Sequence, residues 1–260
     1  MKPLSELGDA ARLRGLLFDI DDTLTTHGRL TAEAYAALER LHARGRRAVA
    51  VSGRPAGWCD HIARMWPVDA VVGENGAFYF RYENGRLHMR YQDTDAERAA
   101  KRARLAAVAL RILAAVPGSA LASDQPYREA DLAIDYCEDV PRLPLEEAER
   151  IAALMRTAGL SAKLSSIHVN GWFGGYDKLA MSKALFAEAF AENLDAVQGE
   201  YAFAGDSPND APMFAYFTHS VGVANIARFA GRLAALPKYV TRAEAGSGFA
   251  ELVGHLLGGA

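Results

Sequence analysis

Short apolar segments alternate with amphipathic helical segments near the start of the chain, and this alternation restricts the fold more than any other feature. Strand-like segments begin at residue 16 and cover 47–53 and 69–77, and helical segments fill 31–45 and 55–66 between them. Parallel strands need long helical crossovers of this kind. The sequence therefore predicts an α/β protein whose doubly wound, Rossmann-like parallel sheet is covered by helices on both faces.

A different pattern interrupts the alternation. Residues 78–91 predict a β-hairpin that turns at Asn84 and Gly85, because this pair supplies the positive φ angles of a tight hairpin turn. A long helix is predicted over 95–115. Further segments follow as a strand, a helix and a strand, at 131–136, 144–159 and 162–173. These elements predict a separate α+β unit.

The alternation resumes in the last third of the chain. Helical and strand-like segments follow one another at 178–190, 200–207, 209–217, 220–225 and 248–257. The simplest organisation is a core domain made of residues 1–80 and 171–260, with an inserted domain at 81–170.

Composition excludes several classes of protein. The chain has 260 residues, half of them hydrophobic, and a formal net charge of -3, which gives no electrostatic footprint for nucleic acid or an anionic membrane. Without a leader or a long apolar run, we expect a soluble cytoplasmic protein that binds neither. Cys59 and Cys137 are too isolated to indicate a disulfide framework or a zinc site. The sequence does not indicate an oligomeric state.

Three carboxylates are crowded directly behind the first apolar strand, in the segment FDIDDT at 18–23. One aspartate is common in a turn, but three in four positions are not explained that way. Asp19 and Asp21 should face the same side of an extended segment, while Ile20 packs inward. We expect Asp22 to hold the turn instead.

A second acidic cluster follows the strand near Phe203, where Asp206 and Asp210 lie in the segment AGDSPND. In a parallel sheet the carboxyl ends of the strands meet at one edge, so both clusters should share a crevice there. That many like charges need a cation to neutralise them. An all-oxygen ligand set suits Mg²⁺.

Four motifs resemble, in the same order and over most of the chain, those of the haloacid dehalogenase-like phosphatase superfamily. FDIDDT fits its DxDxT signature, VSGR at 51–54 its serine motif, GDSPND at 205–210 its GDxxND motif, and Lys178 or Lys183 its lysine motif. GENGA at 73–77 and the inserted domain resemble the subgroup with a large α/β cap. That subgroup includes sucrose-phosphate and mannosyl-3-phosphoglycerate phosphatases.

The resemblance implies roles for individual residues. Asp19 would attack phosphorus and form an aspartyl-phosphate, and Asp21 would serve as general acid and then as base. The resemblance implies that Mg²⁺ is bound by Asp19, Asp21, Asp206 and Asp210. Asp21 would contribute its main-chain carbonyl, and Asp210 would bind the ion directly or through a water molecule. Ser52 and one lysine would bind the phosphoryl oxygens.

The two candidate lysines are five residues apart on one helix and point to different faces, so only one can reach a phosphate. We favour Lys178, which stands at the expected helix start. Leu179 departs from the glycine that often follows this lysine in the subgroup.

Several polar residues are further candidates for phosphate or substrate contacts: Thr23, Gly53, Arg54, Asn75, Asn209 and Asn225. Arg54 is equally compatible with a salt bridge to a surface carboxylate, and the asparagines with turns. His168, Asn170 and Trp172 alternate along one strand and share a face that suits either sugar binding or packing.

These features predict a Mg²⁺-dependent phosphatase for a small phosphomonoester, most simply a sugar phosphate. Two alternatives remain open: a phosphomutase of the phosphomannomutase type, which would return the phosphoryl group to another hydroxyl, and a non-enzymatic signalling phosphoacceptor. Receiver domains of that kind are about half as long and have no cap.

Overall fold

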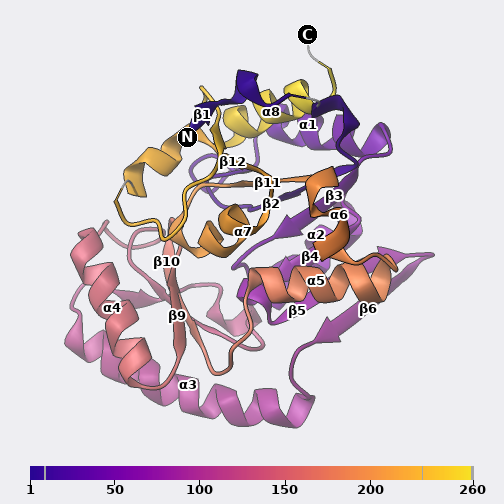
Figure 1. Ribbon diagram of the computed structural model, residues 1–260. Helices are drawn as coiled ribbons and strands as arrows, with labels where there is room; N and C mark the ends of the chain where they lie inside the picture. Colours follow the sequence, from indigo (N-terminus) through magenta and orange to yellow (C-terminus); the bar gives the residue numbers. More distant parts are fainter. Residues whose placement is uncertain (9, 230, 259–260) are drawn as a thin grey trace.

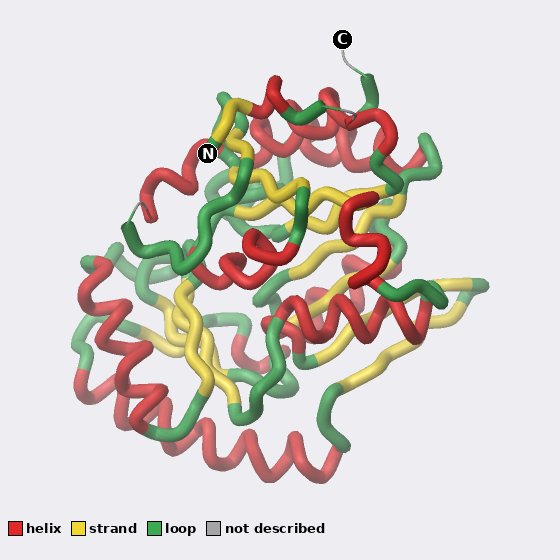
Figure 2. The backbone as a smooth tube through the Cα atoms, viewed as in Figure 1, coloured by secondary structure: helices red, strands yellow, loops and turns green. Residues whose placement is uncertain are grey.

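The structure is a computed structural model that describes residues 1–8, 10–229 and 231–258, and within them it contains two β-sheets (Figures 1 and 2). The larger sheet is built, in spatial order, from β1 (Lys2–Pro3), β13 (Tyr239–Val240), β12 (His219–Gly222), β11 (Tyr201–Gly205), β2 (Gly15–Phe18), β3 (Arg47–Val51), β4 (Ala70–Gly73), β5 (Phe78–Glu83) and β6 (Arg86–Tyr91). The strands from β1 to β4 in this order run parallel, and β5 and β6 are antiparallel.

Helices cover both faces of the larger sheet: α1 (Ala32–Ala43), α2 (Ala56–Met65), α5 (Lys178–Ala189), α6 (Leu194–Val197), α7 (Ala211–Tyr216) and α8 (Ala245–Leu256). Side chains of β2 alternate between the faces. Leu16 and Phe18 pack into the cluster under α1, α2 and α8, whereas Leu17 packs with residues of α5 and α7. This arrangement confirms the predicted doubly wound sheet and explains why β2 is apolar throughout.

The smaller sheet is antiparallel and is formed by β7 (Ala120–Leu121), β8 (Leu132–Asp135), β10 (His168–Trp172) and β9 (Ser161–Leu164). Helices α3 (Asp95–Ala115) and α4 (Leu145–Thr157) pack on it and enclose a second hydrophobic core. Figure 1 shows this group at the lower left, beside the larger sheet. For brevity we call it the cap.

The predicted strand at 162–173 is wrong in one respect, because it is two strands, β9 and β10, joined by a tight turn. The Ser165 hydroxyl accepts the His168 N–H at 3.0 Å, and the Ser165 N–H donates to the His168 carbonyl at 2.9 Å. Serine hydroxyls stabilise such turns weakly, so the sequence offers little sign of this reversal.

The hairpin of β5 and β6 has the expected turn, with φ of 52° at Asn84 and 74° at Gly85. However, it extends the larger sheet through pairing of β5 with β4, so a boundary at residue 81 divides a hairpin that belongs to one sheet. Phe78 and Phe80 are buried in the core of that sheet. We propose that the inserted domain begins after Tyr91.

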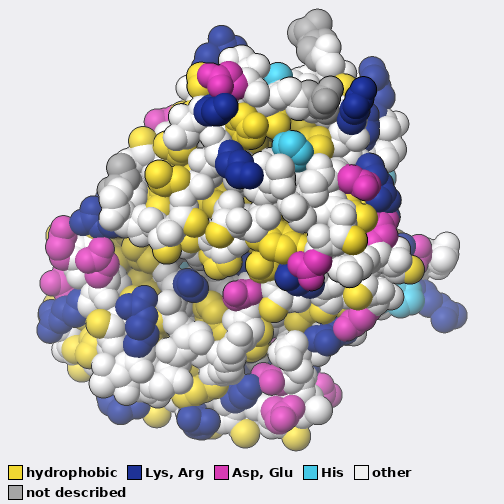
Figure 3. Space-filling model, viewed as in Figure 1, with side chains coloured by type: hydrophobic (Ala, Val, Ile, Leu, Met, Phe, Trp, Pro, Cys, Tyr) yellow, Lys and Arg dark blue, Asp and Glu magenta, His cyan; other side chains and the backbone are white. Residues whose placement is uncertain are grey.

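None of the described helices combines the length and the apolar character that a membrane span requires. Figure 3 shows acidic and basic side chains interspersed over the face it draws.

One glycine fixes the approach of two segments that form the site described below. Gly76, with φ of +107°, lies so close to the start of α5 that an added Cβ would be 2.1 Å from the Asp177 carbonyl oxygen. The side chain of Asp177 caps α5 by accepting the Ala180 N–H at 2.8 Å. The GENGA segment therefore needs glycine here for conformation and for space.

Gly76→Ala should destabilise the protein by roughly 1–3 kcal/mol more than Gly85→Ala. Both variants place alanine at positive φ, at a cost of about 1–2 kcal/mol, but Gly85 has open space around it and Gly76 has backbone. Urea unfolding of the two variants measures the difference. Equal losses would show that the close approach at Gly76 is not strictly required.

Candidate active site

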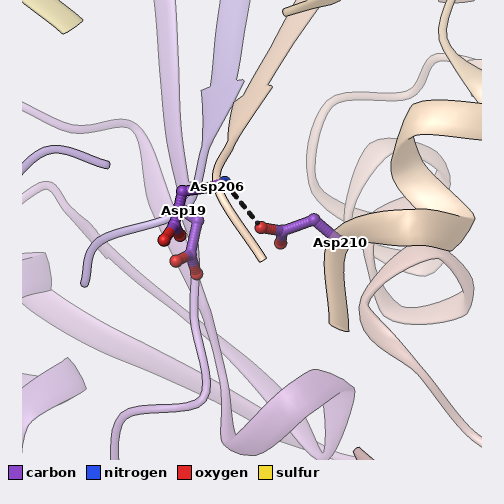
Figure 4. A group of neighbouring side chains, drawn as sticks. All are labelled: Asp19, Asp206 and Asp210. Atoms are coloured by element: carbon purple, nitrogen blue, oxygen red, sulfur yellow. Dashed lines mark hydrogen bonds between the residues drawn. The ribbon is translucent and has the colours of Figure 1, made fainter. Parts of the chain in front are cut away.

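Two acidic residues lie side by side at the carboxyl edge of the larger sheet. Strands β2 and β11 are neighbours that pair Phe18 with Ala204, so the residues after their last positions, Asp19 and Asp206, meet (Figure 4). The Asp19 N–H also donates to the Ala204 carbonyl at 2.9 Å. Asp19 is 4% and Asp206 1% exposed, so both carboxylates are almost removed from solvent.

Asp210 reaches the same place from the short helical turn at 208–210. One of its carboxylate oxygens accepts the backbone N–H of Asp206 at 3.1 Å and of Ser207 at 3.3 Å. A side chain at Gly205 would lie 2.5 Å from that oxygen, which explains the glycine of GDSPND. Asp210 thus shapes the loop that carries Asp206, and this contact pattern favours a positioning role over direct metal binding.

The structure brings Lys178, and not Lys183, to the acidic residues. The Lys178 ammonium lies 2.7 Å from Asp19 Oδ1 and 2.7 Å from Asp210 Oδ1, with its side chain 2% exposed. The Lys183 side chain is 38% exposed and pairs with Asp195 on the surface. Their different positions on α5 follow from helical geometry, as the sequence spacing predicts.

Burial dominates the electrostatics of this group. It raises the pKa of Asp19 to about 8, against the lowering effect of Lys178, and with the neighbouring carboxylates it raises the pKa of Asp206 well above its usual value. Burial lowers the pKa of Lys178, but the charges of Asp19 and Asp210 outweigh it and raise that pKa overall. Lys178 alone therefore does not compensate the negative charge of the ionised carboxylates.

This donor set fits a divalent cation. Oxygens of Asp19, Asp206 and Asp210 lie within 4.8 Å of one another, and one ammonium cannot balance three ionised carboxylates. Mg²⁺ prefers oxygen ligands and few carboxylates, with the remaining positions filled by water or substrate. Asp19 and Asp206 are the residues whose contacts best suit direct ligation.

Other residues of the two loops support the carboxylates. Thr23 is fully buried, and its hydroxyl donates to Asp206 at 3.3 Å, so in this structure it supports that carboxylate. Asn225 donates to Asp206 at 3.2 Å and to the Asp22 carbonyl at 2.9 Å. Asp22 adopts φ of 54° in the turn, as expected, and its N–H is bound by Thr25.

The serine motif lies at the end of β3. The Ser52 hydroxyl is buried and accepts the Arg54 N–H at 3.0 Å, which leaves its own hydrogen free to donate. Asn75 and Asn209 are joined by a 3.3 Å hydrogen bond, and Asn75 also approaches Asp131 of the cap at 3.4 Å. Asn75 therefore links core and cap.

Arg54 is neither a surface residue nor paired with a surface carboxylate. Its guanidinium donates two hydrogen bonds to the carboxylate of Asp21, from Nε at 2.9 Å and from Nη2 at 2.8 Å. The same group contacts Glu138 at 2.6 Å and Asp124 at 3.3 Å, both from the cap side. The guanidinium also lies over the Trp58 ring at 4.2 Å.

The three residues predicted to share a face of β10, His168, Asn170 and Trp172, have different surroundings in the structure. His168 and Asn170 line the remaining space between cap and core, together with Asp21. Trp172 instead stacks on Tyr176, and its ring N–H donates to the Tyr176 carbonyl at 3.1 Å. Trp172 is therefore part of the packing.

Sequence reasoning missed a buried charged network contributed by the cap. Arg128 has no exposed side-chain surface, and it binds Asp124 at 3.0 Å, Asp131 at 2.8 Å and the Gly53 carbonyl at 2.8 Å. The one available sign was the density of charged residues between 124 and 138 beside an apolar strand. Nothing in that pattern indicates which charge meets the core.

The cap lies against the core in this structure. Only about 10 Å³ of space remains between Asp19, Asp21, Gly53, Arg54, Asn209 and the cap residues Ser165, Ile167, His168 and Asn170. That volume holds about one water molecule. A larger cavity of about 610 Å³ adjoins it at Ile167, which lines both, and Glu138 lines the larger cavity. A phosphorylated sugar does not fit into this space, so binding one beside Asp19 would require the cap and the core to separate.

One Mg²⁺ ion should bind per chain, and Asp206→Asn should weaken its binding at least roughly tenfold, because a charged ligand oxygen becomes a neutral amide. Isothermal titration calorimetry measures both quantities. Asp22→Asn is the control: it removes the charge of another buried aspartate, in the loop after β2, that is not assigned as a ligand, and it should change affinity little. Equal effects of the two substitutions would contradict the assigned site.

The fold and the acidic edge together define a doubly wound α/β protein with a cap. The sequence model of the haloacid dehalogenase-like hydrolase family matches residues 13–218, and the chain belongs to this family. A comparison with curated proteins found no match to the sequence.

Solved structures share the whole architecture at low identity. The C-terminal domain of the Candida albicans trehalose-6-phosphate phosphatase is 14% identical, with 99% of each chain covered and a TM-score of 0.71. A HAD/COF-like hydrolase from Plasmodium vivax is 17% identical, with 96% of this chain and 97% of that chain covered and a TM-score of 0.69. The sucrose-phosphatase of Synechocystis, solved with sucrose and phosphate, is 14% identical, with 94% and 98% covered and a TM-score of 0.62.

Proposed function

We propose that this hydrolase is a Mg²⁺-dependent phosphatase that acts on a small phosphorylated metabolite, a sugar phosphate or a similarly polar ester. One observation carries the proposal: Lys178 joins Asp19 to Asp210 beside Asp206, at the strand ends where the family's motifs meet. A nucleophile, a cation site and a fixed ammonium are thus within reach of one phosphoryl group.

Asp19 acts as the nucleophile in this mechanism. Its carboxylate oxygen attacks phosphorus, the bond to the leaving oxygen breaks, and Asp21 gives that oxygen a proton. Asp21 then takes a proton from water, which attacks the aspartyl-phosphate and releases phosphate and Asp19. Lys178 and the Ser52 hydroxyl donate to the phosphoryl oxygens. Asp19 and Asp206 would hold Mg²⁺, which would neutralise charge on these oxygens.

The lining of the cap supports a polar leaving group. Ser165, His168 and Asn170 face Asp21 across the small space, and hydroxyl, imidazole and amide groups suit a polyhydroxyl compound. The similarity to sugar-phosphate phosphatases lies at the level of the fold and agrees with this substrate class.

Purified protein should release phosphate from at least one member of a panel of phosphorylated sugars, glycerates and nucleotides, and EDTA should abolish the release until Mg²⁺ is restored. A malachite-green assay measures it. Dependence on a sugar bisphosphate would indicate a phosphomutase instead, and stable phosphorylation of Asp19 without turnover would indicate a phosphoacceptor.

Asp19→Asn and Asp21→Asn should fail at different steps. Asp19→Asn removes the nucleophile, so both turnover and covalent phosphorylation should vanish. Asp21→Asn should lower turnover by ~10²–10⁴-fold. With p-nitrophenyl phosphate, whose leaving group needs little protonation, Asp21→Asn should accumulate phosphorylated Asp19. Acid quench and mass spectrometry detect it, and label on another residue would refute the assignment.

Lys178→Met should lower kcat by about 10²–10³-fold, because it removes the fixed positive charge at the phosphoryl oxygens. Lys183→Met makes the same chemical change on the same helix and should stay near wild-type activity. Steady-state kinetics compares the two. Comparable losses would mean that the helix tolerates neither change and that the specific role of Lys178 is wrong.

A further inference from the structure

The guanidinium of Arg54 is shared between the core and the cap. Its Nε and Nη2 donate to Asp21, Nη2 also donates to Glu138 at 2.6 Å, and Nη1 donates to Asp124 at 3.3 Å and Glu138 at 3.4 Å. All three of its nitrogens are thus engaged. Two of the three carboxylates come from the side of the inserted segment, so the surroundings of Arg54 change when the cap moves.

Glu138 is held in place to meet Arg54. The carboxylate of Asp135, at the end of β8, accepts the backbone N–H of Cys137 and of Glu138, each at 2.8 Å. On its other side Glu138 lies 2.8 Å from Nε2 of His168. Burial raises the pKa of Glu138, but His168 and Arg54 outweigh it and lower that pKa to about 2. Glu138 is therefore a fixed anion.

We propose that Glu138 is a positioning residue, which acts through Arg54 to orient the carboxylate of Asp21 while the cap is closed. The inference rests on the proposed function, because it assigns Asp21 the role of acid and base. A guanidinium that donates two hydrogen bonds to one carboxylate fixes the plane of that carboxylate. Glu138 in turn holds the guanidinium of Arg54 in place.

This orientation matters most for the second half of the reaction. Water forms a bond to phosphorus, the bond from phosphorus to Asp19 breaks, and the proton of water passes to one oxygen of Asp21. Proton transfer requires that oxygen within hydrogen-bond distance of the water. If the contact between Arg54 and Glu138 is lost, Asp21 keeps its hydrogen bonds to Arg54, but Arg54 loses its nearest carboxylate.

The alternative is that Glu138 contacts the leaving group directly, since it also lines the adjoining cavity. p-Nitrophenyl phosphate separates the two roles, because its leaving group has no hydroxyl groups to recognise and needs little protonation. A residue that only recognises a sugar has no effect on it. A residue that positions the base slows hydrolysis of the phosphorylated enzyme.

The test compares wild type, Glu138→Ala and Glu138→Gln with p-nitrophenyl phosphate and Mg²⁺. Glu138→Ala should lower kcat by roughly 10–100-fold, and phosphorylated Asp19 should rise in the steady state, as measured by acid quench and mass spectrometry. Glu138→Gln keeps an acceptor oxygen and should lose less. Asp139→Ala, at the neighbouring position whose carboxylate binds Ser123, should behave as wild type.

A double-mutant cycle with Arg54→Lys decides whether Glu138 acts through Arg54. Lysine keeps the buried positive charge but not the fork, so adding Glu138→Ala should then cost less than about twofold. If Glu138→Ala does not fold, Glu138→Gln completes the cycle.

Three results would overturn the inference while leaving the phosphatase proposal intact: unchanged kcat in Glu138→Ala, additive losses in the cycle, or a higher KM with less phosphorylated Asp19. A wild-type protein that hydrolyses no ester would overturn the phosphatase proposal itself, and with it this inference.

Discussion

The ammonium of Lys178, buried between Asp19 and Asp210, is the contact on which the rest of the site depends. Removing one partner from a buried ion pair leaves an uncompensated charge, which costs far more than the pair gains. The three carboxylates would otherwise repel one another in a nearly dry environment. Because Lys178 begins α5, the helix must start at a fixed place beside the sheet, and Gly76 provides the close approach that puts it there.

The same GENGA segment also joins the cap to the core. The Glu74 carboxylate, at a residue with φ of 42°, accepts the backbone N–H of Ala56 at the start of α2 and those of Glu129, Ala130 and Asp131. A single side chain therefore satisfies donors from both domains. Backbone groups that would be left unpaired in a buried junction are bound, so the junction can exclude water.

Local patterns were enough to predict the parallel sheet and the acidic edge. The two-residue spacing of Asp19 and Asp21 and the place of Lys178 at a helix start are determined by a few neighbouring residues. The contacts of Arg54 are not, because Glu138 lies 84 positions away and nothing in the sequence says which acidic residue of the cap will meet it. The hairpin joins the larger sheet through pairing of β5 with β4, the preceding strand, and the sequence pattern did not indicate this pairing.

Arg54 shows why such distant contacts matter to chemistry. A general base and acid must change its charge during the reaction, whereas its geometry has to stay constant. A guanidinium stays charged throughout and presents rigid donors, so it can hold Asp21 in either half of the proposed reaction. Tying the far side of that guanidinium to the cap makes the geometry of Asp21 depend on closure. In the mechanism we propose, Asp21 is then fully oriented as acid and base only when water and leaving group are enclosed with it.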